Sequence, residues 1–293
     1  MLRWAAVPAL AFVVAFGISL AHFTLDDDGG GKDAAHAARP PAAGGEGRLV
    51  VTYTPAVDDA GHGYLGSLRL DGSDLRTVIE PPGEVGAAST GSPSVSPDGR
   101  SSALQRAVAD AGRPGPPFVW AIPLDGSKPE RRVTDGSAPE MDPAWSPDGR
   151  RIAFARQVGG SFDLFSVRTD GTGERRLTDT PRVDELWPAW SPDGHRIAFA
   201  RYEIGLERGS GDLWTADAGG GHERMLVGDE HDYSGPAWSP DGRRIALLKD
   251  SLVAVMDAGG GVPRPLTRGG DFKESRPSWS PDGSRLAFTR DPG

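Results

Sequence analysis

Short apolar segments separated by Pro, Asp and Gly recur along most of the chain. The tetrapeptide Ser-Pro-Asp-Gly marks each recurrence, and it begins at Ser96, Ser146, Ser191, Ser239 and Ser280. In the two clearest copies, residues 143–156 and 188–201, the pattern is Pro-x-Trp-Ser-Pro-Asp-Gly-x-Arg-Ile-Ala-Phe-x-Arg. The copies follow one another at intervals of 50, 45, 48 and 41 residues. This spacing is typical of repeated four-stranded units, so the chain is predicted to be all-β.

Each unit is predicted to contain four short strands. In the second complete unit they are residues 143–146, 151–156, 163–168 and 174–178. Before the first copy, strands matching the second, third and fourth positions are expected at residues 49–54, 64–70 and 75–79. After the last copy, residues 277–280 and 285–290 match the first and second positions. The two partial sets give five units with one surplus strand if they combine, or six units if they stay separate. Because the sequence stops part-way through a unit, closure through the N-terminal strands is expected.

The repeated tetrapeptide has the composition of a tight turn. Pro147 fixes φ at an early turn position, the Asp148 carboxylate can accept a hydrogen bond from the backbone two residues on, and Gly149 can adopt a positive φ. The other turn carboxylates, Asp98, Asp193, Asp241 and Asp282, are explained in the same way without a bound ion. A large indole at one equivalent position can fill the wedge between neighbouring sheets, and this position is held by Trp145, Trp190, Trp238 and Trp279.

The repeat resembles that of TolB-like β-propellers, which occurs in the periplasmic TolB protein and in the propeller domains of prolyl-oligopeptidase-type peptidases. The resemblance covers residues 48–293. It implies a β-propeller of four-stranded blades, five or six in number. The peptidase relatives carry a separate hydrolase domain with a Gly-x-Ser-x-Gly elbow, and no such motif is present in this chain.

An apolar run at residues 4–21 follows Arg3 and precedes Asp26. A positive start and an acidic exit orient such a segment with its N-terminus in the cytoplasm. We expect residues 1–23 to form a hydrophobic helix, either a signal peptide cleaved after Ala21 or a retained membrane anchor. Residues 24–47 are predicted to be a disordered Gly/Ala/Pro linker. The rest of the protein is therefore expected to be extracytoplasmic, either membrane-anchored or secreted.

Composition narrows the chemistry further. The formal net charge of −9 disfavours nucleic acid and anionic membrane surfaces as partners. The absence of cysteine excludes disulfides, thiolate catalysis and Cys-based zinc sites. Metalloprotease, phosphate-loop and EF-hand motifs are also absent. No catalytic residue, metal ligand or cofactor is assigned, although a divalent ion at His231 is an alternative to a solvated acidic loop.

Carboxylates and aromatic residues gather in the loops that enter the innermost strands. We expect them to lie on one face, together with the basic residues that end the second strands, Arg106, Arg156, Arg201, Lys249 and Arg290. These charges either pair between neighbouring blades or form a binding ring around the channel mouth. The candidate partner-binding residues are Glu140, Asp142, Asp184, Glu185, Trp187, Asp229, Glu230, His231, Asp232, Tyr233, Asp271 and Glu274.

The leading functional hypothesis is a monomeric, noncatalytic extracytoplasmic propeller that binds a protein or peptide on this acidic face. One alternative is a carbohydrate- or peptide-processing enzyme that uses carboxylates at the channel mouth as acid and base. Another is a protein that binds a small ligand or a cation there. Membrane association is expected only through the N-terminal segment.

Overall fold

The computed structural model describes residues 21–23, 48–53, 64–69, 76–79, 90–107, 115–125, 130–136, 138–205, 211–269 and 273–291. All regular secondary structure in these residues is β. None of them forms a helix long and apolar enough to cross a membrane. The predicted N-terminal helix and linker lie outside the described residues, except that Ala21–Phe23 form a strand, β1.

Five four-stranded antiparallel sheets follow one another along the described part of the chain. The first contains β1 (Ala21–Phe23), β2 (Arg48–Tyr53), β3 (Tyr64–Arg69) and β4 (Arg76–Ile79). The second contains β5 (Thr90–Val95), β6 (Ser101–Ala107), β7 (Pro117–Pro123) and β8 (Arg131–Arg132). The third contains β9 (Glu140–Trp145), β10 (Arg151–Val158), β11 (Ser161–Arg168) and β12 (Arg175–Arg176).

The remaining strands complete two further sheets and a smaller C-terminal unit. The fourth sheet contains β13 (Val183–Trp190), β14 (Arg196–Glu203), β15 (Asp212–Asp217) and β16 (Arg224–Val227). The fifth contains β17 (Tyr233–Trp238), β18 (Arg244–Lys249), β19 (Leu252–Asp257) and β20 (Arg264–Pro265). The C-terminal unit consists of two strand pairs, β21 (Lys273–Glu274) with β24 (Arg290–Asp291) and β22 (Ser278–Trp279) with β23 (Leu286–Ala287).

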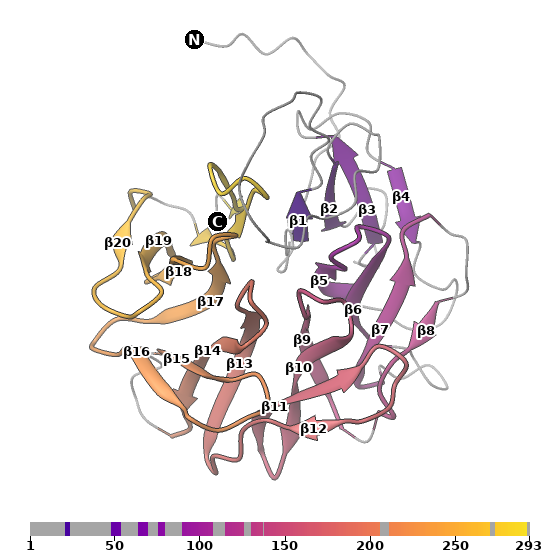
Figure 1. Cartoon of the computed structure of the whole chain (residues 1–293), viewed down its shortest axis with the longest axis horizontal. Helices are drawn as coiled ribbons and strands as arrows, with labels where there is room; N and C mark the ends of the chain where they lie inside the picture. Colours follow the sequence, from indigo (N-terminus) through magenta and orange to yellow (C-terminus); the bar gives the residue numbers. More distant parts are fainter. Residues whose placement is uncertain are drawn as a thin grey trace, which may run out of the picture.

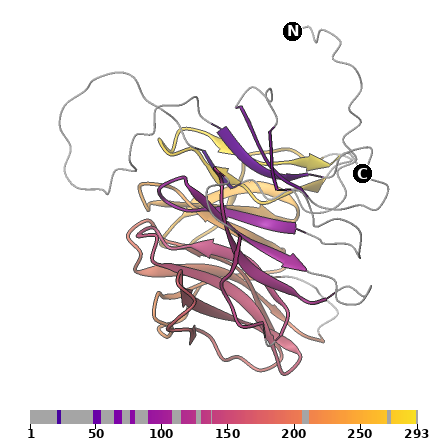
Figure 2. The ribbon, with the colours of Figure 1, turned by 90° about the vertical axis from the view of Figure 1, so that its right-hand side faces the viewer.

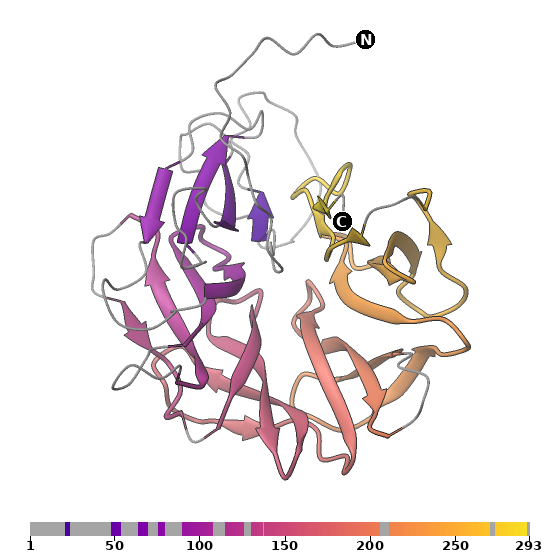
Figure 3. The ribbon, with the colours of Figure 1, turned by 180° about the vertical axis from the view of Figure 1, so that it is seen from behind.

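The sheets are arranged around a central axis in chain order. The first strand of each sheet lies nearest the centre and the fourth lies at the rim (Figure 1). The view from behind shows the same ring (Figure 3). This arrangement confirms the predicted all-β propeller, in which adjacent sheets bury each other's faces.

The two ends of the ring differ from the sequence-based expectation. The predicted N-terminal strands are present as β2, β3 and β4, but they do not share a sheet with the C-terminal strands. The expected closure by a shared sheet is therefore wrong, because β1 takes the innermost position and pairs with β2. Strands β1 and β22 are in contact, and the indigo and yellow strands lie at the same end of the molecule in the edge-on view (Figure 2).

The Ser-Pro-Asp-Gly segments form the predicted tight turns between first and second strands. In the third sheet, Arg150 N and Ser146 Oγ donate to Asp148 Oδ1 at 3.0 and 2.6 Å, and Gly149 has a φ of +69°. The same contacts recur in the other four copies. Hydrogen bonds from Ser191 and from the backbone at His195 lower the pKa of Asp193, as expected for a carboxylate that accepts several donors. The turn role assigned to these carboxylates is confirmed.

We expect Asp282→Asn to flatten the loss of stability at acidic pH. Hydrogen bonds from Ser280 and Ser284 lower the pKa of Asp282 to about 2, whereas an unfolded aspartate titrates near about 3.9. The folded state therefore favours the ionised form, and this stabilisation is complete above about pH 5 and is lost as the pH falls through about 2. Urea unfolding of both proteins across this range measures the effect. Asp257→Asn, an exposed change outside the Ser-Pro-Asp-Gly turns, is the matched control. An equal slope for all three proteins would contradict the prediction.

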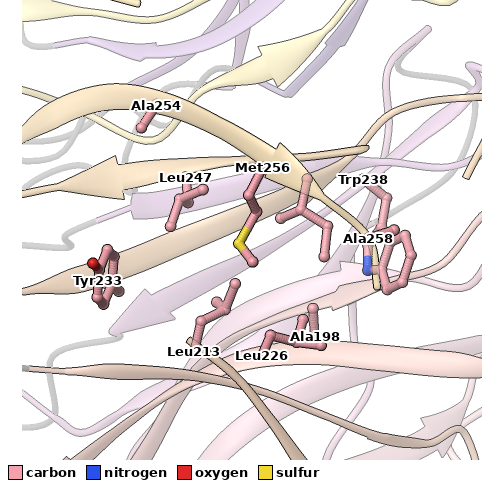
Figure 4. Close-up of a cluster of buried hydrophobic side chains, with 10 residues drawn as sticks. Ala198, Leu213, Leu226, Tyr233, Trp238, Leu247, Ala254, Met256 and Ala258 are labelled. Carbon is pink, nitrogen blue, oxygen red and sulfur yellow. The ribbon is translucent and has the colours of Figure 1, made fainter. Parts of the chain in front are cut away.

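The repeated tryptophans join neighbouring sheets as predicted. Trp238 Nε1 donates to Ala189 O of the preceding sheet at 3.1 Å, and Trp190 and Trp279 make the equivalent bonds. The ring of Trp238 belongs to a core cluster shared by the fourth and fifth sheets (Figure 4). Each indole thus contributes both apolar area and a directed hydrogen bond to the interface.

Candidate interaction face

Three of the predicted partner-binding carboxylates are buried between sheets. Glu140 lies on β9, and both Nε and Nη2 of Arg156 donate to its Oε1, at 2.9 and 2.6 Å. The other oxygen of Glu140 accepts from Val119 N, at 3.1 Å, and from Thr134 Oγ1, both in the preceding unit. Glu140 therefore links two sheets and does not present its carboxylate to a partner.

Glu274 and Glu185 hold the same position on later strands. Glu274 accepts from Arg290, Thr267 Oγ1 and Val253 N, the last two at 2.5 and 2.8 Å. Glu185 pairs with Arg201 at 2.5 Å. In each case the ion pair lies within one unit. Pairing between neighbouring blades, one of the two alternatives left open by the sequence, is therefore not found for these three carboxylates. Glu140 and Glu274 are joined to the preceding sheet by neutral donors, a threonine hydroxyl and a valine amide in each case.

Burial affects these carboxylates to different extents. It raises the pKa of Glu140 and of Glu185, while the adjacent Arg156 and Arg201 act in the opposite direction. For Glu274, burial is outweighed by the hydrogen bonds from Thr267, the Val253 amide and Arg290, and the pKa is lowered. None of the three is placed as an exposed acid or base at the channel mouth.

The acidic loop that enters β17 is internally hydrogen-bonded. Tyr233 is buried, and its hydroxyl donates to Asp229 at 3.1 Å. Asp232 Oδ1 accepts from Tyr202 Oη at 3.0 Å, and a 2.6 Å hydrogen bond joins His231 Nδ1 to Asp250. The described residues contain no cluster of three His, Cys, Asp or Glu side chains suited to a metal ion. Tyr233 is therefore a core residue, which corrects its assignment as a surface anchor.

Four residues from separate units converge near the axis. They share the third position of the innermost segment in each unit: Asp142, Trp187, Gly235 and Arg276. Arg276 Nη1 donates to Asp142 Oδ1 at 3.0 Å although the two residues are 134 apart in sequence. The guanidinium of Arg276 also lies 6.0 Å from the Trp187 ring centroid. A Cβ on Gly235 would meet Arg276 Cγ at 2.4 Å, so these positions form one cluster, which we call the axial cluster.

The backbone of the axial cluster is left-handed at three of its positions. Gly235 has a φ of 55°, which is unstrained for glycine, but Asp142 and Trp187 have φ values of 54° and 55°. A bulky residue rarely adopts this conformation, and such strain is concentrated at functional sites. Trp187 is half-buried and packs edge-on against Tyr202, with ring centroids 5.8 Å apart. An indole is therefore held at the mouth of the ring at a conformational cost.

Exposed carboxylates surround this mouth on the loops of the same face. Antiparallel pairing places the start of each first strand and the end of each second strand at one edge of the sheet. The exposed acidic residues there are Asp135, Asp179, Glu203, Asp229, Glu230 and Asp250. Among the predicted residues, Asp184 is half-buried and accepts from Phe162 N at 2.8 Å, and Asp271 lies outside the described residues. The exposed carboxylates of these loops are thus mostly residues other than the predicted ones.

Comparison with known proteins identifies structures that share the fold. No protein-family model and no curated protein matches the sequence. A putative TolB from Agrobacterium tumefaciens superposes with a TM-score of 0.66 and 22% identity, covering 84% of this chain and 87% of that chain. The fold is TolB-like. TolB from Acinetobacter baumannii superposes with a TM-score of 0.62 and 21% identity, covering 82% of this chain and 57% of that chain.

The TolB-like fold is shared with part of an enzyme. Puromycin hydrolase superposes with a TM-score of 0.60 and 21% identity over 86% of this chain, but only 40% of the hydrolase is covered. Identities of this size establish the fold alone, and one fold can host many activities.

Several residues in the axial cluster and in the loops around it were not predicted from the sequence. Arg276 and Tyr202 were missed because their partners are distant in sequence. Asp179, Glu203 and Asp250 could have been found from the sequence. In every unit, the loop that enters the first strand and the loop between the second and third strands lie on the same face, and these residues are in such loops.

Proposed function

We propose that this protein is a noncatalytic extracytoplasmic propeller that binds a protein or peptide partner at its acidic face, centred on the axial cluster. The observation that carries the proposal is the left-handed backbone of Trp187. A glycine serves at the equivalent position of the next sheet, so the scaffold does not require an indole there. Aromatic side chains held rigidly at a surface are common anchors in interfaces.

The exposed carboxylates define the chemistry of the partner. Six of them surround the mouth, and the whole chain carries a net charge of −9. Such a face attracts a basic segment and accelerates its encounter. A basic peptide or a basic protein loop, with an aliphatic or cationic group against Trp187, is the proposed ligand.

An enzymatic role receives less support from the same geometry. General acid–base catalysis by two carboxylates requires that both groups can exchange protons with the substrate. Glu140, Glu185 and Glu274 are buried against arginines, and Asp142 accepts from Arg276. A structural role for these carboxylates accounts for their contacts.

The wider organisation is proposed on the same basis. The apolar segment at residues 4–21 and the following linker support export, with the propeller outside the cytoplasm. We count the C-terminal unit as a sixth blade, in which β21 and β22 together take the first strand position and β23 and β24 the second, since it follows the fifth sheet and contacts β1. The protein is proposed to act as a monomer.

Neutralising the exposed acidic loops should weaken partner binding. We expect Asp179→Asn, Glu203→Gln and Glu230→Gln together to reduce capture of the partner at least tenfold at low salt, because three attractive charges are lost. The measurement is crosslinking of the purified full chain to envelope proteins of its host, followed by mass spectrometry. The matched control removes three exposed charges from turns on the opposite face, Asp170→Asn, Asp217→Asn and Asp257→Asn.

A second variant tests the anchor itself. Trp187→Gly reproduces the residue found at Gly235 and should leave the fold intact while abolishing capture. Equal capture by the wild type, the triple variant and Trp187→Gly would exclude the proposed face.

A further inference from the structure

The residues of the axial cluster are placed by a repeated β-bulge. In the third, fourth and fifth sheets, two residues of the first strand, the axial residue and the proline after it, face a single residue of the second strand. Proline has no N–H to donate to the neighbouring strand, so an irregularity in the ladder is expected there. A bulge re-aims a side chain away from the regular alternation of the strand. The chemistry of the axial residue can therefore differ from unit to unit, and it does so in all four.

Arg276, which lies between β21 and β22, extends across the axis to the third sheet. Its aliphatic stem passes Gly235, where a Cβ would meet Arg276 Cγ at 2.4 Å and Cδ at 3.1 Å. Its guanidinium donates from Nη1 to Asp142 Oδ1 at 3.0 Å. The Asp142 side chain is 7% exposed and that of Arg276 is 29% exposed. A cation that solvent can reach is thus paired with a buried carboxylate.

The neighbours of this guanidinium are the groups that recognise arginine in general. A carboxylate matches the planar fork of its donors, and an aromatic ring attracts its charge. Arg276 has both, with the Trp187 ring centroid at 6.0 Å. Arg156 and Arg201 also have both, but their side chains are only 7% and 11% exposed and pair with carboxylates of their own units. Arg276 differs because its pair with Asp142 joins distant units and remains accessible.

We propose that Arg276 holds the place of an arginine side chain of the partner, which displaces it and takes over both Asp142 and the ring of Trp187. This inference rests on the proposed function and specifies the group that the axial cluster recognises. A lysine ammonium is a compact, strongly hydrated charge without the planar fork, and it is therefore a poorer replacement.

The exchange also limits the affinity of the free protein. One guanidinium replaces another, so the pair with Asp142 contributes little net affinity, and the partner must first compete with Arg276. The apparent affinity is then reduced by the fraction of molecules in which Arg276 has left its place. Arg276 thereby selects for partners whose other contacts, such as those with the exposed acidic loops, are favourable enough to drive the displacement.

Removing the guanidinium tests the exchange directly. Arg276→Gln should bind a fluorescein-labelled peptide of four Arg-Ser repeats about tenfold more tightly than the wild type does, because no internal arginine has to be released first. Fluorescence anisotropy with the full-length protein measures the affinity. The matched control Arg243→Gln makes the same change in net charge at an exposed turn of the opposite face. The affinity of this control should stay within about twofold of the wild type, because the change is remote from the axis.

Two further comparisons identify the group that is recognised. A peptide of four Lys-Ser repeats should gain less affinity than the Arg-Ser peptide. Adding Asp142→Asn to Arg276→Gln should remove the gain, and asparagine tolerates the left-handed backbone of this position. Arg276→Lys keeps a cation beside Asp142, and its affinity should lie between those of the wild type and Arg276→Gln. This variant supplies the comparison if Arg276→Gln does not fold.

Unchanged or weaker peptide binding by Arg276→Gln or Arg276→Lys would overturn the inference, because Arg276 would then be a fixed link or a direct contact of the ligand. An equal gain for the Lys-Ser peptide, or a gain that survives Asp142→Asn, would do the same. Loss of partner capture in Trp187→Gly without a gain in Arg276→Gln would reject this inference alone. The expected peptide results, together with partner capture that neither Trp187→Gly nor the triple neutralisation changes, would reject the proposed function and leave the exchange standing.

Discussion

Replacing Glu140 by alanine is expected to lower the free energy of unfolding by about 3–5 kcal/mol, the range found when one partner of a buried ion pair is removed. The substitution leaves the Arg156 guanidinium next to an apolar site, with the more exposed Glu174, at 2.5 Å, and Asp135, at 3.6 Å, as its remaining acidic neighbours. It also removes the acceptor for Val119 N and Thr134, so the link to the preceding sheet is lost. Urea denaturation followed by tryptophan fluorescence measures the change.

A matched control for this prediction lies in the same class of loop. Glu230 is exposed, and Glu230→Ala should change stability by no more than about 0.5 kcal/mol. Similar losses for Glu140→Ala and Glu230→Ala would contradict the assignment of Glu140 as an inter-sheet link. The double variant Glu140→Ala, Arg156→Ala should be less unstable than the sum of the single changes, because each single change already removes the interaction that the two side chains share.

Trp238→Ala is expected to destabilise the protein by a similar amount, about 3–5 kcal/mol. The ring fills the wedge between the fourth and fifth sheets and shares a cluster with Leu213 and Met256. Truncation leaves a cavity that the two rigid sheets cannot close, and the Ala189 carbonyl loses its donor. Chemical denaturation with two probes, fluorescence and far-ultraviolet circular dichroism, tests whether the loss is global.

The hydrogen-bond contribution can be separated from the packing contribution. Trp238→Phe keeps most of the ring volume but leaves Ala189 O without its indole donor, at a cost of about 1–3 kcal/mol. Trp145 Nε1 is buried and makes no hydrogen bond with a described residue, so Trp145→Phe should cost less than Trp238→Phe. The reverse order would show that shape, and not the directed bond, dominates at this position.

These two kinds of contact explain how the ring is held without disulfides. Buried glutamates at the start of the first strands link one unit to the preceding one. At the other end of these strands, near the Ser-Pro-Asp-Gly turns, tryptophans link neighbouring sheets. Tyr233 takes the glutamate position in the fifth sheet and uses its hydroxyl to bind Asp229 instead. The acidic composition of this face is thus partly structural, and the carboxylates that can attract a partner are those on exposed loops.

The sequence by itself determined the repeated turn, the strand order within each unit and the propeller. Asp148, Gly149 and their equivalents act through hydrogen bonds and φ values that span a few residues, so a local pattern is sufficient to predict them. The apolar face of each strand likewise follows from its own residues.

Only the tertiary structure decided which carboxylates are exposed and which residues meet at the axis. Glu140 and Glu230 occupy similar loops, and what distinguishes them is whether a neighbouring sheet supplies buried donors. Arg276 and Asp142 are brought together by closure of the ring, and no local signal marks the pair. Burial and long-range pairing depend on the faces that other units present, and for this physical reason a one-dimensional pattern did not contain them.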